Sequence, residues 1–348
     1  MRVSMKDVDD MKKGRILTGH RPTGRRHMGH WLGTLENWRR LQDDYECFFL
    51  IADLHVLTTK FGETEFIRDN IIETVRDWLA AGIDPLKSTF VLQSAVPEHA
   101  ELQLLFSMLV TVERLGRNPT YKEQKKELHL EKNASLGLLS YPVLQAADIL
   151  VYRADTVPVG EDQLPHIELT REIARRFNHL YGDTFPEPQG LLSPTPKIPG
   201  IDGRMMHTSY DNAIPLSASE DEVRQRVLSM VTDPLKARLN DPGRPEVCSA
   251  YALLKAFDAL IPVSGSFTLE SVAADCRGGC IGCVADKNRF AEVYIKSLLP
   301  FRTIREKVPP EVVWEILASG THKAREVARE TMELTRERMH LTHARLPF

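Results

Sequence analysis

Short apolar stretches, each followed by a helical pattern, recur through the first half of this chain and limit its fold more than any other feature. Residues 47–54 (CFFLIADL) form an apolar run, as expected of a strand buried on both faces of a sheet. Further strands are expected at 15–19, 88–93 and 156–160, and helices at about 28–42, 63–81, 97–115 and 163–181. Strands that alternate with helices predict a doubly wound parallel sheet, whose ligands bind at the carboxyl ends of the strands.

The strand pattern disappears beyond residue 217. Helical patterns cover about 219–231, 252–260, 290–298 and 310–345, and Ser219 with Glu222 three residues later predicts a capping box. The Pro- and Gly-rich stretch 186–203 is expected to be a long mobile connection. We therefore expect an α/β protein with an N-terminal extension (1–14), a Rossmann-like doubly wound catalytic domain (15–217) and an all-helical C-terminal domain (218–348).

Charge and apolar content exclude several classes of protein. The chain has 45 Lys and Arg against 48 Asp and Glu, a net charge of −3, so nucleic acid would have to bind at a local basic patch. Residues 1–14 lack the apolar core of a signal peptide, and no apolar run approaches the ~20 residues of a membrane helix. We expect a cytoplasmic protein with neither DNA nor a membrane as a partner.

A glycine-rich turn, residues 18–30 (TGHRPTGRRHMGH), lies between the first strand and the first helix. Gly19 and Gly24 permit tight turns, and the helix amino terminus that follows can receive a phosphate. His27 and His30 are three residues apart on the first helical turn, so both imidazoles can face that phosphate, and Gly29 leaves room for an adenine ring. Two surface histidines at a helix start are the alternative for a bare H-x-G-H, but the whole string favours ATP binding.

This string resembles the HIGH motif of class I aminoacyl-tRNA synthetases, in the form found in tryptophanyl-tRNA synthetases. Residues 141–150 (YPVLQAADIL), 157–163 (VPVGEDQ) and 166–171 (HIELTR) extend the resemblance through nearly the whole chain. It implies a ligase that uses ATP with Mg²⁺ to activate L-tryptophan and transfers it to tRNA(Trp). It also implies a homodimer in which the helical domain reads the anticodon.

The resemblance assigns roles to individual residues. Asp148 would accept the indole N–H, while Tyr141 and Gln163 would hold the α-amino group. An acceptor matched to one N–H can discriminate against phenylalanine by ~10⁴ or more. A solvent-facing helix carboxylate is the alternative for Asp148, but its apolar neighbours favour burial. The implied tryptophan-binding residues are Gly19, Tyr141, Gln145, Asp148 and Gln163; the ATP-binding residues are Arg21, Thr23, Gly29, His30, Gly160, Asp162, Gln163 and Met206; and the catalytic residues are His27, His30 and Arg204.

Two positions make this pocket unusual for the family. Gln145 stands where several bacterial members have methionine, so one wall of the pocket is more polar than theirs. Arg21 adds a charged side chain to the glycine-rich turn. Both residues bear on which amino acid the pocket accepts.

The second signature of the class, KMSKS, has lost its lysines. The flanks match the family at 198–204 (IPGIDGR) and 210–214 (YDNAI), but the loop between reads MMHTS, with Met205 and Thr208 at the two lysine positions. Loss of one preorganised donor to transition-state charge typically costs ~3 kcal/mol. Three interpretations stay open: substitution by Arg204, Lys197 or His207 with Mg²⁺; a paralogue that binds tryptophan, ATP or RNA without charging tRNA; or activation of an amino acid for a small-molecule acceptor.

Four of the five cysteines have the spacing C-x27-C-x3-C-x2-C, at Cys248, Cys276, Cys280 and Cys283. In a cytosolic chain such a group predicts a metal site more than disulfides. Some bacterial tryptophanyl-tRNA synthetases carry a four-iron, four-sulfur cluster on a C-x22-C-x6-C-x2-C pattern, whose fourth position here is Asp286. We expect such a cluster, with Cys280 or Asp286 as the fourth ligand and zinc as the second candidate.

Overall fold

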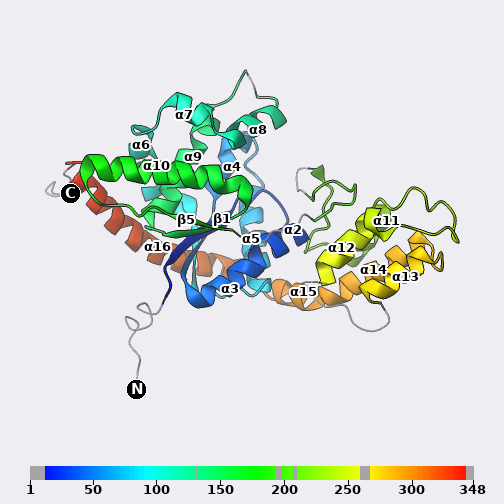
Figure 1. Cartoon of the computed structure of the whole chain (residues 1–348). Coiled ribbons are helices and arrows are strands. Elements are labelled where there is room, and N and C mark those ends of the chain that lie inside the picture. Colours follow the sequence, from blue (N-terminus) through cyan, green and yellow to red (C-terminus); the bar gives the residue numbers. More distant parts are fainter. Residues whose placement is uncertain (1–11, 131, 193–197, 207–209, 259–266, 342–348) are drawn as a thin grey trace.

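The core of the molecule is one parallel sheet flanked by helices (Figure 1). The structure, a computed structural model, describes residues 12–130, 132–192, 198–206, 210–258 and 267–341. Its sheet has the order β3-β2-β1-β4-β5, and every neighbouring pair is parallel. The strands are β1 (Arg15–His20), β2 (Glu46–Ile51), β3 (Ser88–Leu92), β4 (Thr156–Val159) and β5 (Gln189–Leu192). This confirms the predicted α/β, doubly wound fold.

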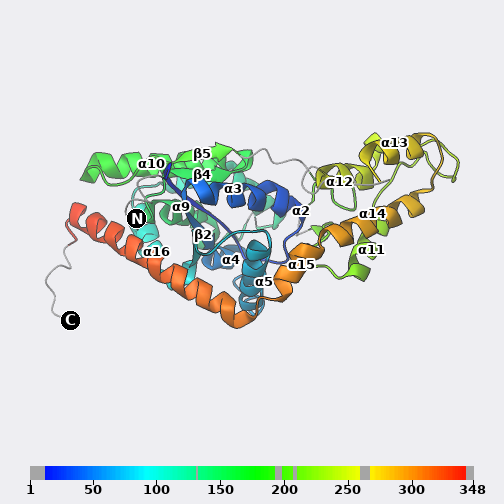
Figure 2. The same ribbon diagram turned by 90° about the horizontal axis from the view of Figure 1, so that it is seen from below.

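Helices lie on both faces of the sheet and form a separate lobe beyond it (Figures 1 and 2). Those of the first part are α2 (Met28–His30), α3 (Glu36–Asp44), α4 (Asp53–Lys60), α5 (Ile67–Ala80), α6 (Glu98–Ser107), α7 (Val112–Gly116), α8 (Pro119–Glu127), α9 (Leu136–Val151) and α10 (Leu164–Tyr181). Those of the second part are α11 (Glu220–Ser229), α12 (Ser249–Asp258), α13 (Leu269–Arg277), α14 (Cys283–Ser297), α15 (Leu299–Glu306) and α16 (Pro310–Arg338). No helix among the described residues is long and apolar enough to cross a lipid bilayer.

Alternate residues of the central strands enter two different cores. Phe49 of β2 packs in the cluster that contains α3 and α5, whereas Phe48 packs in the cluster that contains α6, α9 and α10. A strand covered on both faces has no polar side, which is why the run at 47–54 lacks alternation. The strand ends at Ile51, and Asp53 already begins α4.

The last helix returns from the helical lobe to the sheet. Helix α16 runs along β3 at the sheet edge (Figure 2). The Leu92 backbone N–H donates to Thr321 Oγ1 at 3.0 Å, so the helix satisfies part of the open edge. A Cβ on Gly320 would overlap the Phe90 carbonyl oxygen and lie 2.8 Å from the Phe90 nitrogen. The helix can approach the strand this closely because residue 320 has no side chain.

Several boundaries differ from the sequence prediction. The predicted helix at 97–115 is two helices, because Thr111 caps α7 by accepting from the Arg114 N–H. The predicted helix at 28–42 contains a π-helical turn at Trp31–Leu35. The Pro- and Gly-rich connection contains β5, a short strand with weak strand propensity that pairs with β4.

The predicted capping box at Ser219 is only half present. Ser219 accepts from the Glu222 N–H at 3.2 Å, as expected. The Glu222 carboxylate does not return to the cap and instead pairs with both terminal nitrogens of Arg25, at 2.9 and 2.7 Å. A tertiary contact between the helical lobe and the glycine-rich turn therefore replaces the local one.

We predict that Gly320→Ala destabilises the protein. In an unconstrained helix, replacing glycine by alanine raises the free energy of unfolding by up to ~1 kcal/mol. Here the clash with the β3 backbone should instead lower it by ~1–3 kcal/mol. Chemical denaturation gives the free energy of unfolding, and Ser319→Ala, at an exposed position one residue earlier, is the control. A gain in stability at Gly320 would contradict the observed packing.

Candidate active site

The two histidines of the first signature, His27 and His30, form a capping box at the start of α2. His27 is the N-cap of α2, and its Nδ1 accepts from the Gly29 N–H at 3.1 Å. The His30 Nδ1 accepts in turn from the His27 backbone N–H at 3.3 Å. Because His27 Nδ1 is an acceptor, the neutral His27 ring carries its proton on Nε2. His30 Nε2 lies 3.4 Å from Arg26 Nη1, a nitrogen that can only donate. The rings lie 4.0 Å apart at the carboxyl end of β1, where a parallel sheet binds ligands.

A buried arginine holds the turn in front of these histidines. Arg26 is 4% exposed, and its Nη2 donates to the Arg21 carbonyl at 2.6 Å and to Thr74 Oγ1 at 3.3 Å. Burial raises the pKa of Asp77 on α5 to about 7, against the opposing charge of Arg26. Arg305 on α15 donates to the same carboxylate at 2.7 Å. The turn is thereby connected to the base of the helical lobe.

Asp148 is the buried charge at the centre of the sheet's carboxyl edge. It is 2% exposed, as its apolar neighbours predicted. His55 Nε2 donates to Oδ2 at 2.7 Å, Gln93 Nε2 donates to Oδ1 at 2.8 Å, and His99 Nδ1 lies 2.7 Å from Oδ1. Burial raises the pKa of Asp148, but the two imidazoles outweigh burial and hold this pKa well below its usual range. The carboxylate is therefore ionised at neutral pH.

The sequence analysis missed His55, Gln93 and His99, although two of them carried a signal. His55 lies just beyond β2, and Gln93 follows the last residue of β3. The carboxyl ends of parallel strands meet at one edge of the sheet, so polar residues at both positions were candidates for one site. His99 lies within α6 and had no comparable signal in the sequence.

Tyr141, Gln145 and Asp148 lie along one face of α9, at spacings of four and three residues. The Tyr141 hydroxyl is 3.2 Å from His166 Nε2. The Asn118 amide nitrogen lies 3.2 Å from His166 Nδ1, while its oxygen accepts from the Thr120 and Tyr121 N–H groups. This arrangement makes Nδ1 an acceptor, so the neutral His166 ring donates from Nε2 to the Tyr141 oxygen.

The remaining implied nucleotide residues lie on loops around this edge. Gly19 is the second-last residue of β1, where a Cβ would overlap the Leu50 carbonyl oxygen. The Thr23 N–H donates to the Arg21 carbonyl at 2.9 Å. After β4, Gly160 precedes a 3₁₀ turn in which Gln163 Nε2 donates to Asp162 Oδ2 at 2.6 Å. The first signature and the segment after β4 thus lie at the carboxyl ends of neighbouring strands, and the individual roles of their residues stay predictions.

The second-signature loop offers little positive charge among its described residues. Met205 is 60% exposed, whereas Met206 is buried and its N–H donates to the Ile198 carbonyl at 2.8 Å. Arg204 is paired with Asp202, with its Nε at 2.7 Å and its Nη2 at 2.6 Å, and its guanidinium lies over the Tyr210 ring. Lys197 and residues 207–209 lie outside the described residues.

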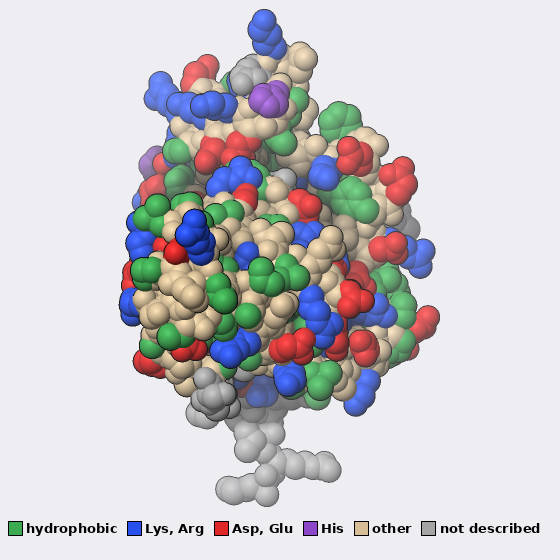
Figure 3. Space-filling view, turned by 90° about the vertical axis from the view of Figure 1, so that its right-hand side faces the viewer, with side chains coloured by type: hydrophobic (Ala, Val, Ile, Leu, Met, Phe, Trp, Pro, Cys, Tyr) green, Lys and Arg blue, Asp and Glu red, His purple; other side chains and the backbone are tan. Residues whose placement is uncertain are grey.

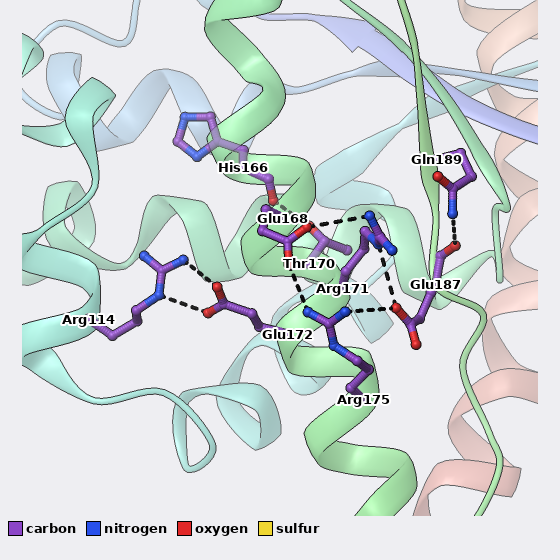
Figure 4. A network of polar contacts seen from close by, with 9 residues as sticks. All are labelled: Arg114, His166, Glu168, Thr170, Arg171, Glu172, Arg175, Glu187 and Gln189. Atoms are coloured by element: carbon purple, nitrogen blue, oxygen red, sulfur yellow. Dashed lines mark hydrogen bonds and ion pairs between the residues drawn. The ribbon is translucent and has the colours of Figure 1, made fainter.

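Helix α10 has one face toward the site and another bound to its neighbours (Figure 4). His166 projects from its first turns, while Glu172 pairs with Arg114 of α7 through two bonds of 2.8 and 2.7 Å. Glu187, before β5, contacts Arg175 at 3.1 Å. Exposed pairs of this kind contribute little individually, but together they fix α10 between α7 and β5.

Three of the four cysteines that the spacing predicted as metal ligands lie around one cavity. Cys248, Cys276 and Cys283 line one small cavity together with Asp286. Cys280 is exposed and does not line it. Among the described residues, no group of three or more His, Cys, Asp or Glu side chains is placed to hold a metal ion.

Comparisons with known proteins place this geometry in a family. The family model "tRNA synthetases class I (W and Y)" matches residues 10–298. The tryptophan–tRNA ligase of Thermotoga maritima is 51% identical over 324 residues, covering 92% of this chain and 97% of that protein. That of Aquifex aeolicus is 41% identical, covering 92% and 98%. A crystal structure of Campylobacter jejuni tryptophanyl-tRNA synthetase with ADP and tryptophan superposes with a TM-score of 0.85 at 32% identity, covering 94% of this chain and 99% of that one.

The parallel sheet, the histidine-capped turn and the polar edge above them are those of a class I aminoacyl-tRNA synthetase. The chain belongs to the tryptophan and tyrosine branch of that class.

We predict that His166 makes the folded state sensitive to acid. Burial lowers the pKa of His166 to about 4, with Asp162 opposing the shift. Between pH 6.5 and 4 the unfolded chain therefore binds a proton that the folded chain resists, and stability falls as the pH falls. His166→Gln should reduce the loss of unfolding free energy between pH 7.5 and 4.5 by about 2–3 kcal/mol, measured by urea denaturation. His179→Gln, exposed on the same helix, is the control; equal losses in both variants would refute the assignment.

Proposed function

We infer that this chain is a tryptophan–tRNA ligase, which joins L-tryptophan to tRNA(Trp) at the expense of ATP. The observation that carries this conclusion is the buried, ionised Asp148 carboxylate on the pocket face of α9. An ionised carboxylate can accept about four hydrogen bonds, and His55, Gln93 and His99 occupy only some of these positions. One indole N–H can occupy a remaining position. Phenylalanine has no such donor and would leave that position unused.

The reaction has two steps at one edge of the sheet. A carboxylate oxygen of tryptophan attacks the α-phosphorus of ATP, the bond to the β-phosphate breaks, and pyrophosphate leaves with the bonding electrons. A terminal ribose hydroxyl of the tRNA then attacks the activated carbonyl, and AMP leaves. His27 and His30 contact the phosphates, and Tyr141 with Gln163 holds the α-amino group. Mg²⁺ accompanies ATP, as is usual for this family.

Charging of tRNA tests the function directly. Purified protein should transfer labelled tryptophan to tRNA(Trp) and leave tRNA(Tyr) uncharged. Activation of tryptophan without transfer would instead favour the small-molecule ligase, and binding without activation would favour the non-charging paralogue. The proposal places the protein in the cytoplasm, where tRNA charging supports translation.

We propose the tRNA-binding surface from family membership and the dimer surface from exposed apolar side chains. The helical lobe, predicted to read the anticodon, has Lys and Arg interleaved with Asp and Glu on the face seen in Figure 3, so that face has no large patch of one charge.

Large apolar side chains are exposed at Leu104, Met108, Val112 and Leu136, on or next to α6, α7 and α9. Such side chains at the surface favour an interface with a second copy of the chain.

The cysteine cavity keeps one metal hypothesis open. Lys236 and Lys287 line it beside the three thiols, and ammonium groups there favour an anionic iron–sulfur cluster over neutral thiols. Burial raises the pKa of Cys248 and of Cys276, so without metal both are protonated. An iron–sulfur cluster, or zinc in its place, therefore stays a prediction for these residues, with Asp286 as the fourth ligand, and iron and sulfide analysis decides it.

Asp148 should recognise the indole N–H itself. We predict that the benzothiophene analogue of tryptophan, in which sulfur replaces N–H, binds at least tenfold more weakly than tryptophan, because a charged acceptor is left unpaired. Asp148→Asn keeps the shape of the side chain and should remove most of that preference. Calorimetric titration measures both affinities. Equal affinity of the unmodified protein for the two ligands would rule out Asp148 as the indole acceptor.

Restoring the lysines should accelerate activation. We predict that Met205→Lys combined with Thr208→Lys raises the rate of tryptophan-dependent pyrophosphate exchange by tenfold or more, since one preorganised donor is typically worth ~10²–10³. Met205→Gln with Thr208→Gln, of similar size without charge, is the control. An unchanged rate in the lysine variant would show that positive charge is already supplied from elsewhere.

A further inference from the structure

Arg21 is a partly buried cation with no acidic partner among the described residues. It lies in the glycine-rich turn, half-buried, and its Nη2 donates to Thr59 Oγ1 of α4 at 2.6 Å. Its Nε is buried and has no hydrogen-bond partner among the residues that the structure describes. Within that same part of the chain, no carboxylate lies within ion-pair distance of it. A guanidinium removed from water without a counter-ion costs several kcal/mol, so this position favours an anionic ligand.

The neighbouring Arg26 shows what a structural arginine in this turn looks like. Arg26 is buried more deeply, and the Asp77 charge beside it raises its pKa against burial. Its guanidinium also donates to the Arg21 carbonyl, so it fixes the backbone of the turn. Arg21 has no such acid, although burial lowers its pKa in the same way. The Asp77 charge thus offsets part of the burial of Arg26, whereas no acid in the described part of the chain acts on Arg21. The Nε of Arg26, like that of Arg21, has no hydrogen-bond partner among the described residues.

The position of Arg21 indicates which chemical group of a bound substrate it would contact. Thr59, which anchors it, lies one helical turn after His55 on α4, and His55 holds Asp148. Residues four apart on a helix are neighbours about 5–6 Å apart on one face. Arg21 also lies close enough to the Tyr141 phenol that each alters the other's pKa. Arg21 is therefore joined through α4 to the residue that holds Asp148, and it lies within electrostatic reach of Tyr141. The inferred function assigns Asp148 and Tyr141 to one and the same amino acid.

We propose that Arg21 binds the α-carboxylate of the amino acid and stays beside the α-phosphate as the mixed anhydride forms. This proposal rests on the function inferred above. It moves Arg21 from a contact with ATP alone, which the resemblance implied, to the junction of the two substrates. There the attacking carboxylate and the non-bridging α-phosphate oxygens carry negative charge that one guanidinium can contact together. Arg21 would then supply charge that the lysine-free loop lacks, but at the α-phosphate and not at the departing pyrophosphate.

The test compares ligands with and without the carboxylate. Calorimetric titration gives the affinity of the unmodified protein, Arg21→Met and Arg25→Met for tryptophan and for tryptophanol, whose hydroxymethyl group replaces the carboxylate. Arg25 is a matched control, because it is in the same turn but is exposed and paired with Glu222. We expect Arg21→Met to lower the affinity for tryptophan by about 30-fold or more, since truncating one partner of a buried charge pair is costly. The affinity for tryptophanol should fall by less than about threefold. Arg25→Met should change neither affinity by more than about threefold.

Each other outcome has a distinct meaning. Equal weakening of tryptophan and tryptophanol by Arg21→Met would show a collapsed pocket and overturn the proposal. Unchanged tryptophan affinity together with a raised KM for ATP would return Arg21 to the triphosphate, and would overturn it as well. Arg21→Lys should recover part of the tryptophan affinity. If the unmodified protein binds neither ligand, the inferred function fails, whatever the variants do.

Discussion

The ionised Asp148 carboxylate in the interior is the constraint on which the rest of the site depends. An unpaired charge at such depth would cost several kcal/mol, so the fold has to bring donors to it from separate elements. His55 follows β2, Gln93 follows β3, and His99 comes from α6. These contacts fix α9 against the carboxyl edge of the sheet, and with it the face that carries Tyr141. The amino-acid pocket is thus a consequence of satisfying one buried charge.

Positive charge is distributed unusually around this pocket. In the second-signature loop, Met205 occupies a lysine position and Arg204 is paired with Asp202. In the first signature, Arg21 and Arg26 place two guanidinium groups in the turn that contains His27 and His30. Among the described residues, the turn that follows β1 therefore carries more positive charge than the second-signature loop. By the proposal for Arg21, this distribution favours stabilisation of charge at the α-phosphate over stabilisation of the leaving pyrophosphate.

Much of this could be predicted from the sequence because it depends on local patterns. The apolar run of β2, the glycine-rich turn and the burial of Asp148 all follow from neighbouring residues, and the fold class follows from their order. Contacts between distant elements could not be predicted in this way. Glu222 was expected to complete its own helix cap but pairs with Arg25, and β5 is too short to have a pattern of its own. Cys280 had a suitable spacing, yet its exposure depends on how α13 and α14 pack, which spacing does not determine.

The most direct test of the account is the exchange of labelled pyrophosphate into ATP by the unmodified protein, measured with each of tryptophan, tyrosine and phenylalanine. Exchange requires amino-acid binding, ATP binding and reversible adenylation at one site, but no tRNA. The account predicts exchange that depends on tryptophan and is at background with phenylalanine, even if it is slow because of the lysine-free loop. Exchange at background with all three amino acids, or an equal rate with tryptophan and phenylalanine, would contradict it.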